Sequence, residues 1–147
     1  MIKNRWLLVF FLVWWGTLAF AQEETTVSKD TSIVRDVDKV PQFPGGTRGW
    51  IRFVQNNMDI TDVVMAMDST AYVQYGLKQT AYLEFTVCED GEICDIDILN
   101  KNKISPEFAR EVFRIMKKSP KWQPAMLGDK PVRTRFRQPI VAVLNDQ

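Results

Sequence analysis

The chain offers few residues with the chemistry of an active site. It contains no histidine, which excludes Ser-His-Asp and Cys-His catalysis and removes the commonest zinc ligand. Its two cysteines, Cys88 and Cys94, are too few for a metal site without histidine. The acidic pair Glu89 and Asp90 falls in a predicted turn. We therefore expect that the protein is not an enzyme and uses no cofactor and no metal.

Arginine recurs at every second position of the stretch VRTRFR near the C-terminus. Arg133, Arg135 and Arg137 should therefore lie on one face of a strand. The simpler interpretation is that they pair with acidic residues on neighbouring strands, which contributes less than about 1 kcal/mol for each exposed pair. The candidate acidic residues are Glu84, Asp95 and Asp97. The alternative is a surface that attracts a partner.

The composition is that of a foldable domain without a preference for nucleic acid. Of the 147 residues, 46% are hydrophobic and 25% are charged, and the net charge is +1. So small a net charge argues against nucleic-acid binding through a general basic field. The length suits one domain with short appendages.

The N-terminal segment has the pattern of a secretory signal peptide. Two basic residues precede an uncharged apolar run over residues 6–20, and residues 19–21 fit a small-x-small cleavage site. The run is shorter than the ~20 residues that a membrane-spanning helix needs. We expect residues 1–21 to be removed on export, which leaves Gln22 as the new N-terminus. An uncleaved membrane anchor is the alternative.

Residues 22–39 are polar and have no sustained period, which is typical of a short tether. The domain should then occupy residues 40–147. Thr47 is a candidate N-cap for a first helix whose apolar side begins at Trp50. Residues 58–76 fit either a second short helix or an irregular linker.

The clearest element is a β-hairpin over residues 80–100, with an Asp-Gly turn at residues 90–91. A two-residue turn puts all large apolar side chains on one face and predicts the pairs Leu83–Ile98, Phe85–Ile96 and Val87–Cys94. In that register Cys88 faces away from Cys94, which argues against a disulfide. Export argues for one, and the bond would need a bulge with the glycine left-handed. Both states of the cysteines stay open.

A helix and a last strand complete the domain. Ser105 is a good N-cap, Pro106 suits the first helical position and Pro120 ends the helix. The last strand should run from Val132 to Leu144. Pro139 cannot donate to a sheet ladder, so it indicates an edge strand or a bulge.

Trp122 stands between Pro120 and Pro124 in the connection from this helix to the strand. The prolines restrict the backbone, and the indole can bury a large apolar area. We expect these three residues to be structural and to anchor the connection on the core, in preference to binding a ligand.

Three stretches together resemble the C-terminal domain of the TonB family, in the form common in Bacteroidetes-type envelope proteins. They are PQFPGG, YGLKQTAYLEFTVCEDGEICDIDIL and SPKWQPAMLGDKPVRTRFRQPIVAVL, within about residues 40–144. The last stretch is the specific one. The resemblance implies an α+β fold in which a small three-stranded antiparallel sheet packs against two helices.

The resemblance also implies a function. In this family the domain binds a short segment of an outer-membrane transporter by adding it as a strand at a sheet edge. It implies here a periplasmic protein-binding domain linked to TonB-dependent transmembrane transport. The partner-binding edge strand would carry Arg133, Arg135, Arg137 and Pro139. The alternative is a self-associating domain, such as a homodimer, with a structural role in an envelope complex.

The sequence departs from a complete energy transducer of this family. The predicted tether over residues 22–39 reaches at most ~60 Å when fully extended. It is not proline-rich, and the apolar segment before it has no histidine. We therefore expect the binding domain to be present without the segments that connect an energy transducer to its inner-membrane motor.

Overall fold

The computed structural model describes residues 32–144, so the predicted signal peptide over residues 1–21 lies outside the described residues. In chain order the elements are α1 (Gly46–Asn57), α2 (Ile60–Ala66), α3 (Ser69–Tyr75), β1 (Lys78–Val87), β2 (Ile93–Ile98), η1 (Lys101–Lys103), α4 (Pro106–Met116), β3 (Ala125–Leu127), β4 (Lys130–Val132) and β5 (Thr134–Val143). Within this part of the chain, no helix has the length and apolar character needed to cross a membrane.

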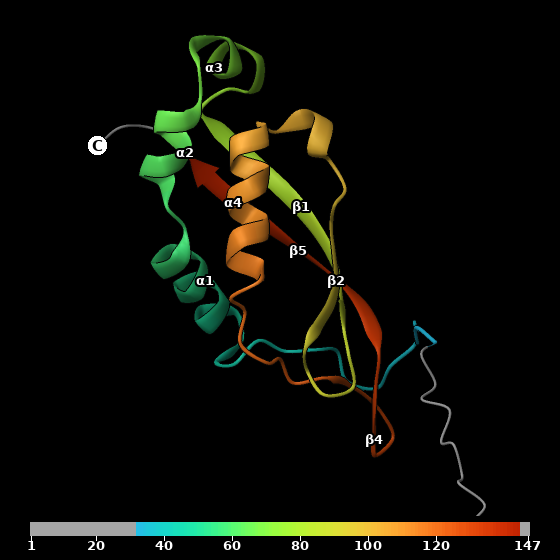
Figure 1. Ribbon diagram of the computed structural model, residues 1–147. Coiled ribbons are helices and arrows are strands. Elements are labelled where there is room, and N and C mark those ends of the chain that lie inside the picture. Colours follow the sequence, from blue (N-terminus) through green and yellow to red (C-terminus); the bar gives the residue numbers. More distant parts are fainter. Residues whose placement is uncertain (1–31, 145–147) are drawn as a thin grey trace, which may run out of the picture. The chain divides into compact units, whose positions relative to one another are not determined.

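A three-stranded antiparallel sheet forms the centre of the fold, with the strand order β2-β1-β5 (Figure 1). This confirms the predicted α+β class. The described residues contain four α-helices where the sequence predicted two. The last strand, predicted over Val132–Leu144, is β5, and only Val132 belongs to β4, which pairs with β3 in a separate hairpin.

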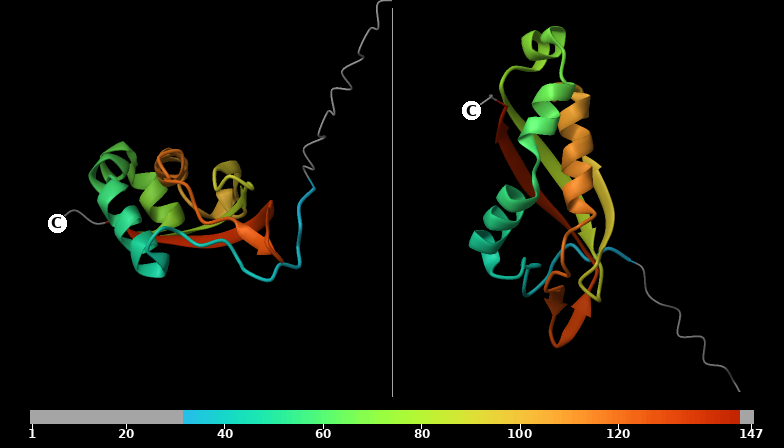
Figure 2. Two further views of the ribbon diagram at one scale, coloured as in Figure 1. Left: turned by 90° about the horizontal axis from the view of Figure 1, so that it is seen from below. Right: turned by 60° about the vertical axis from the view of Figure 1, so that its left-hand side comes forward.

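The helices α1, α2 and α4 lie on one face of the sheet (Figure 2). Alternate residues of β1 fill the core beneath them, and the central ones, Leu83 and Phe85, are almost fully buried. From α4, Phe108 and Val112 pack into the same cluster. The apolar side chains that alternate along β1 and those that recur at helical spacing along α4 therefore pack in the same core.

The start of α4 follows its sequence signals. The Ser105 hydroxyl accepts a hydrogen bond from the Phe108 amide at 3.2 Å, and Pro106 occupies the first turn. The start of α1 does not follow them. That helix begins at Gly46, with Gly45 as a left-handed cap and no capping side chain, so the Thr47 prediction is wrong. Glycine takes this conformation without a steric penalty.

Residues 58–76 form two short helices, each with an aspartate cap. The carboxylate of Asp59 accepts from the Asp62 amide at 2.9 Å, and that of Asp68 accepts from the Ala71 amide at 2.8 Å. Short side-chain acceptors of this kind satisfy amides that have no partner in the first helical turn. The region is therefore regular, which resolves the ambiguity that its sequence left.

The β1–β2 hairpin departs from the predicted register near its loop. The pairs Leu83–Ile98 and Phe85–Ile96 are confirmed, but Val87 pairs with Ile93 and not with Cys94. Cys94 is the extra residue of a β-bulge, and Gly91 in the loop has a φ of 83°. The bulge turns Cys94 toward Cys88, and the two form a disulfide with their Cα atoms 6.0 Å apart.

We predict that this disulfide supports the fold but is not essential to it. The cysteines are 6 positions apart in the sequence, and closing so short a loop contributes about 2 kcal/mol in the chain-entropy model. Replacing buried Cys88 with Val and exposed Cys94 with Ser should lower the free energy of unfolding by that amount. Denaturant unfolding measures it, with the reduced wild-type protein as control. A double variant that cannot fold would contradict the estimate.

Glu111 is a buried carboxylate that joins α4 to the α1–α2 connection. Its side chain is only 4% exposed. It accepts hydrogen bonds from the Asp59 amide and from the Arg114 guanidinium, and Arg114 also donates to the Asn57 carbonyl. The Arg114 hydrogen bond, with a smaller contribution from the Asp59 amide, holds the pKa of Glu111 below its usual value against the opposing effect of burial.

We predict that Glu111 makes stability depend on acid pH. Because its folded-state pKa is lowered, its contribution is present above the unfolded-state pKa of about 4.3 and is lost as the pH falls through the folded-state pKa. Glu111→Gln should cost about 1–2 kcal/mol at neutral pH. Thermal melts of both proteins should show this difference shrinking below about pH 4. A difference that stayed constant with pH would contradict the prediction.

Candidate protein-binding edge

The strand β5 forms one edge of the three-stranded sheet. It pairs with β1 along its whole length, from Thr134 opposite Val87 to Val143 opposite Lys78. No described strand pairs with its other side. An edge of this kind presents backbone N–H and C=O groups to whatever lies beside it.

The hydrogen bonds of Tyr82 show which residues of β5 face outward. The Tyr82 amide donates to Asn100 Oδ1, and its carbonyl accepts from the Leu99 amide, both at 2.9 Å and both on the side away from β5. Pro139 is the residue opposite Tyr82 across the β1–β5 pair. In an antiparallel pair, opposite residues direct their backbone groups either both inward or both outward. Pro139 therefore faces outward.

The orientation alternates along the strand, so the outward-facing residues of β5 are Arg135, Arg137, Pro139, Val141 and Val143. The missing amide of Pro139 falls on the outer edge and leaves the ladder to β1 intact. The sequence could not distinguish an edge strand from a bulge at this proline. The strand order and the register resolve that choice in favour of the edge.

Among residues 32–144, contacts to the outer edge are confined to its N-terminal end, at Arg133 and Thr134. The Val34 amide donates to the Arg133 carbonyl at 2.9 Å, and the Thr134 hydroxyl donates to the Val34 carbonyl at 2.6 Å. Further on, Lys39 and Gln42 make antiparallel bridges to the β3 region. The described part of the predicted tether thus lies against the domain, and the open part of the edge begins at Arg135.

The three arginines of the stripe have different surroundings. Arg135 and Arg137 share Glu84, at 3.4 Å from Arg135 Nη1 to Glu84 Oε1 and 2.7 Å from Arg137 Nε to Glu84 Oε2. Arg133 instead lies 3.6 Å from Glu89 and has only 18% of its side chain exposed. One carboxylate, that of Glu84, is thus shared between the two guanidinium groups nearest the open edge.

Of the three predicted acidic partners, Glu84 pairs with these arginines, whereas Asp97 pairs with Lys101 at 2.6 Å. The Lys101 hydrogen bond holds the pKa of Asp97 below its usual value. Arg135 contributes a smaller lowering of the same pKa, so Asp97 interacts with the stripe through space although its ion pair is with Lys101. The third candidate, Asp95, lies opposite Thr86 on β2.

A comparison with protein-family models agrees with this geometry. Residues 73–141 match the model described as the Gram-negative bacterial TonB protein C-terminal, which spans the whole sheet except the last residues of β5. Residues 73–141 thus form a domain of the TonB C-terminal type. No curated protein sequence matches the chain. TonB C-terminal domains interact with outer-membrane proteins and are not enzymes, and proteins of this family act in the cell envelope.

In this TonB C-terminal domain, Trp122 is at the centre of the aromatic core near the end of the sheet. It is 5% exposed, and its indole Nε1 donates to the Ser119 hydroxyl at 2.9 Å. Its ring lies 5.1 Å from that of Phe85 and 5.4 Å from that of Phe43, both edge to face. Of the flanking prolines, Pro120 is exposed and Pro124 is half-buried.

The β1–β2 loop packs directly on the backbone of Trp122. The Trp122 amide donates to the Gly91 carbonyl at 2.8 Å, and a Cβ atom on Gly91 would lie 2.1 Å from the Trp122 carbonyl oxygen. Only glycine permits this approach. The sequence indicated a turn at Gly91 but not the packing of Gly91 on Trp122. This packing accompanies the bulge that replaces the predicted two-residue turn.

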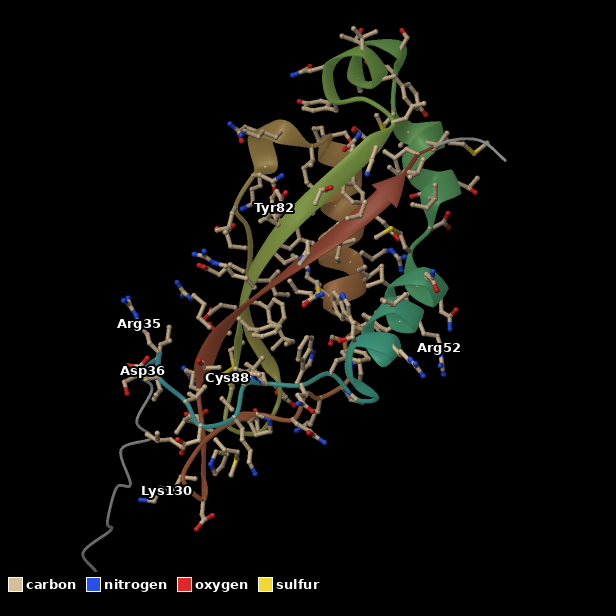
Figure 3. The ribbon with its side chains drawn as sticks, turned by 180° about the vertical axis from the view of Figure 1, so that it is seen from behind. Arg35, Asp36, Arg52, Tyr82, Cys88 and Lys130 are labelled. Carbon is tan, nitrogen blue, oxygen red and sulfur yellow. A yellow bond between two sulfur atoms is a disulfide. The ribbon has the colours of Figure 1, made fainter. Side chains whose placement is uncertain are left out.

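The face of the sheet turned away from the helices is visible in Figure 3, with Tyr82 labelled on it. Its part near the N-terminal end of β5 carries Glu84, Arg135 and Arg137. Its other part carries the exposed large apolar side chains Tyr82, Leu99, Val141 and Val143, with Lys78 opposite Val143. The open edge of β5 therefore has a charged half and an apolar half.

Proposed function

We propose that this protein is a periplasmic binding domain that captures an extended segment of an envelope protein as an added strand on the outer edge of β5. The observation that carries the proposal is the row of outward-facing backbone groups from Arg135 to Val143 in a TonB C-terminal domain. Backbone hydrogen bonds would supply affinity that is independent of sequence, and neighbouring side chains would supply register.

The two guanidinium groups nearest the edge favour a segment that carries a carboxylate. Arg135 and Arg137 are 49% and 72% exposed at their side chains and share one carboxylate. An acidic residue in the captured strand would balance the second guanidinium. The family match supports an outer-membrane transporter as the source of the segment and a link to TonB-dependent transport.

A second candidate function is self-association through the same edge. It is favoured by the exposure of Val141 and Val143, at 52% and 53%, beside backbone groups that another copy could pair with. Light scattering during size-exclusion chromatography separates the two candidates. A stable dimer that dissociates on replacing both valines with Lys would support self-association, and a monomer would support capture of a different protein.

Photo-crosslinking in cells tests the proposed function directly. A photoreactive phenylalanine analogue at Val141 would lie on the open edge. The matched control places it at Arg110, which is exposed at 73% of its side chain on α4. We expect a crosslink to an outer-membrane protein from position 141 and none from position 110. A crosslink only to a second copy, or equal crosslinks from both positions, would contradict capture.

A further inference from the structure

A hollow of about 290 Å³ opens between β5 and the segment that leads into α1. From β5 it is lined by Phe136 and Gln138, and from the connection by Trp122. The remaining lining residues are Val40, Pro41, Gln42, Phe43, Gly46, Thr47 and Trp50. Its volume is just below the ~300–1,000 Å³ typical of small-molecule sites, so it suits a single side chain better than a metabolite.

The hollow lies on the helix-covered side of the open edge. Along β5, the side chains of Phe136 and Gln138 alternate with those of Arg135 and Arg137, so the two pairs point to opposite faces. Phe136 belongs to the core cluster, whereas Arg137 is exposed on the other face. A strand added beside β5 has the same alternation. Its residue opposite Phe136 or Gln138 would therefore point toward the hollow.

The inner wall of the hollow is aromatic and rigid. Phe43, Trp50 and Trp122 are 7%, 5% and 5% exposed, which shows that other side chains hold them in place. Trp122 lies 5.7 Å from Trp50 and 5.7 Å from Phe136, measured between ring centroids. Aromatic walls of this kind bind apolar and especially aromatic side chains, which pack against ring edges and faces.

We propose that the captured segment carries an aromatic or large apolar residue that enters this hollow, directly next to an acidic residue that contacts Arg137. The two must be sequence neighbours, because successive residues of a strand point to opposite faces. The residue opposite Arg137 is on the charged face, and the residue beside it is on the hollow side. This inference rests on the proposed strand capture and adds the recognition motif.

The motif also defines the register of the added strand. The backbone edge alone would accept an extended chain at any two-residue offset, because its hydrogen bonds carry no side-chain information. The contact of Val34 with the Arg133 carbonyl occupies the edge before Arg135, and Pro139 faces outward but has no amide hydrogen to donate. An apolar side chain in the hollow would hold the segment at one offset, with its neighbouring carboxylate at the guanidinium pair.

Synthetic peptides test the motif. Each alternates threonine and glutamate around one central residue, which is phenylalanine, leucine or glycine, and carries a fluorescent label for anisotropy. We expect the phenylalanine peptide to bind the wild-type domain at least about tenfold more tightly than the glycine peptide. Tenfold corresponds to about 1.4 kcal/mol, which is less than full burial of the side chain would give.

Two variants test whether the hollow is the source of the preference for the phenylalanine peptide. Thr47→Trp should fill the hollow from the exposed first turn of α1 and make the phenylalanine and glycine peptides bind equally. Gln55→Trp adds the same side chain at an exposed position of α1 that does not line the hollow, and it should keep the preference. Circular dichroism checks that both variants fold. The comparison of the phenylalanine and glycine peptides on the wild-type domain needs neither variant, so it tests the motif even if a variant misfolds.

The outcomes separate the motif from strand capture. Equal binding of the phenylalanine and glycine peptides, with new protection of the outward-facing β5 amides, would overturn the motif and leave strand capture standing. A preference for phenylalanine that survives Thr47→Trp would also overturn the hollow as its source. Binding of the phenylalanine peptide without protection of any β5 amide would overturn strand capture, and the motif with it.

Discussion

Trp122→Ala is expected to lower the free energy of unfolding by about 3–5 kcal/mol, as truncations of large buried aromatic side chains do. The indole is nearly fully buried among Phe43, Phe85 and Phe136 and donates to Ser119. Alanine would leave a cavity in the aromatic cluster that packs the segment leading into α1 against the sheet. Chemical denaturation of the purified domain measures the loss.

Tyr82→Ala is the matched control for this prediction. Tyr82 is aromatic but 53% exposed on the open face, so its loss should cost less than about 1 kcal/mol. Trp122→Phe should recover much of the lost stability. If Trp122→Ala melted like the wild type and lost only partner binding, Trp122 would be a contact residue and its structural role would be wrong.

The second large effect is expected from prolines on the open edge. In the double variant Arg137→Pro, Val141→Pro, each proline deletes an outward-facing amide, as Pro139 already does, and leaves the ladder to β1 complete. Losing two backbone hydrogen bonds at about 1–1.5 kcal/mol each should weaken partner binding by about 30- to 150-fold. Calorimetric titration with a peptide from the periplasmic end of an outer-membrane transporter measures this loss.

Arg137→Ala, Val141→Ala is the control, because it removes the same side chains but keeps both amides. It should bind with intermediate affinity and lose the salt dependence that the Arg137 guanidinium contributes. Both double variants should unfold within about 1 kcal/mol of each other. Equal affinities for the proline and alanine variants would show that the outward amides do not contribute to binding.

Local signals in the sequence predicted the elements that depend on neighbouring residues. Ser105 and Pro106 identified the start of α4, and alternation identified the inward face of β1. Asp59 and Asp68 are equally local caps, so the two short helices were within reach of the same reasoning. The start of α1 was missed because a left-handed glycine cap leaves no side-chain signal.

Features that depend on distant residues could not be predicted. The bulge at Cys94 goes with packing of Gly91 on Trp122, which is 31 positions away along the chain (122 minus 91). Glu111 is a charged residue of α4, yet it is buried and accepts a hydrogen bond from the Asp59 amide of another element. Arg133 looked equivalent to Arg135 and Arg137, but the Val34 contact begins at its carbonyl and its side chain is largely covered.

Residue-resolved amide exchange along β5 tests strand capture most directly. The domain is compared with and without the transporter peptide by nuclear magnetic resonance. Capture predicts new protection at the outward-facing amides of Arg135, Arg137, Val141 and Val143, while the inward-facing amides between them, already bonded to β1, change little. Binding that left these four amides unprotected, or that protected inward and outward amides alike, would contradict strand addition at this edge.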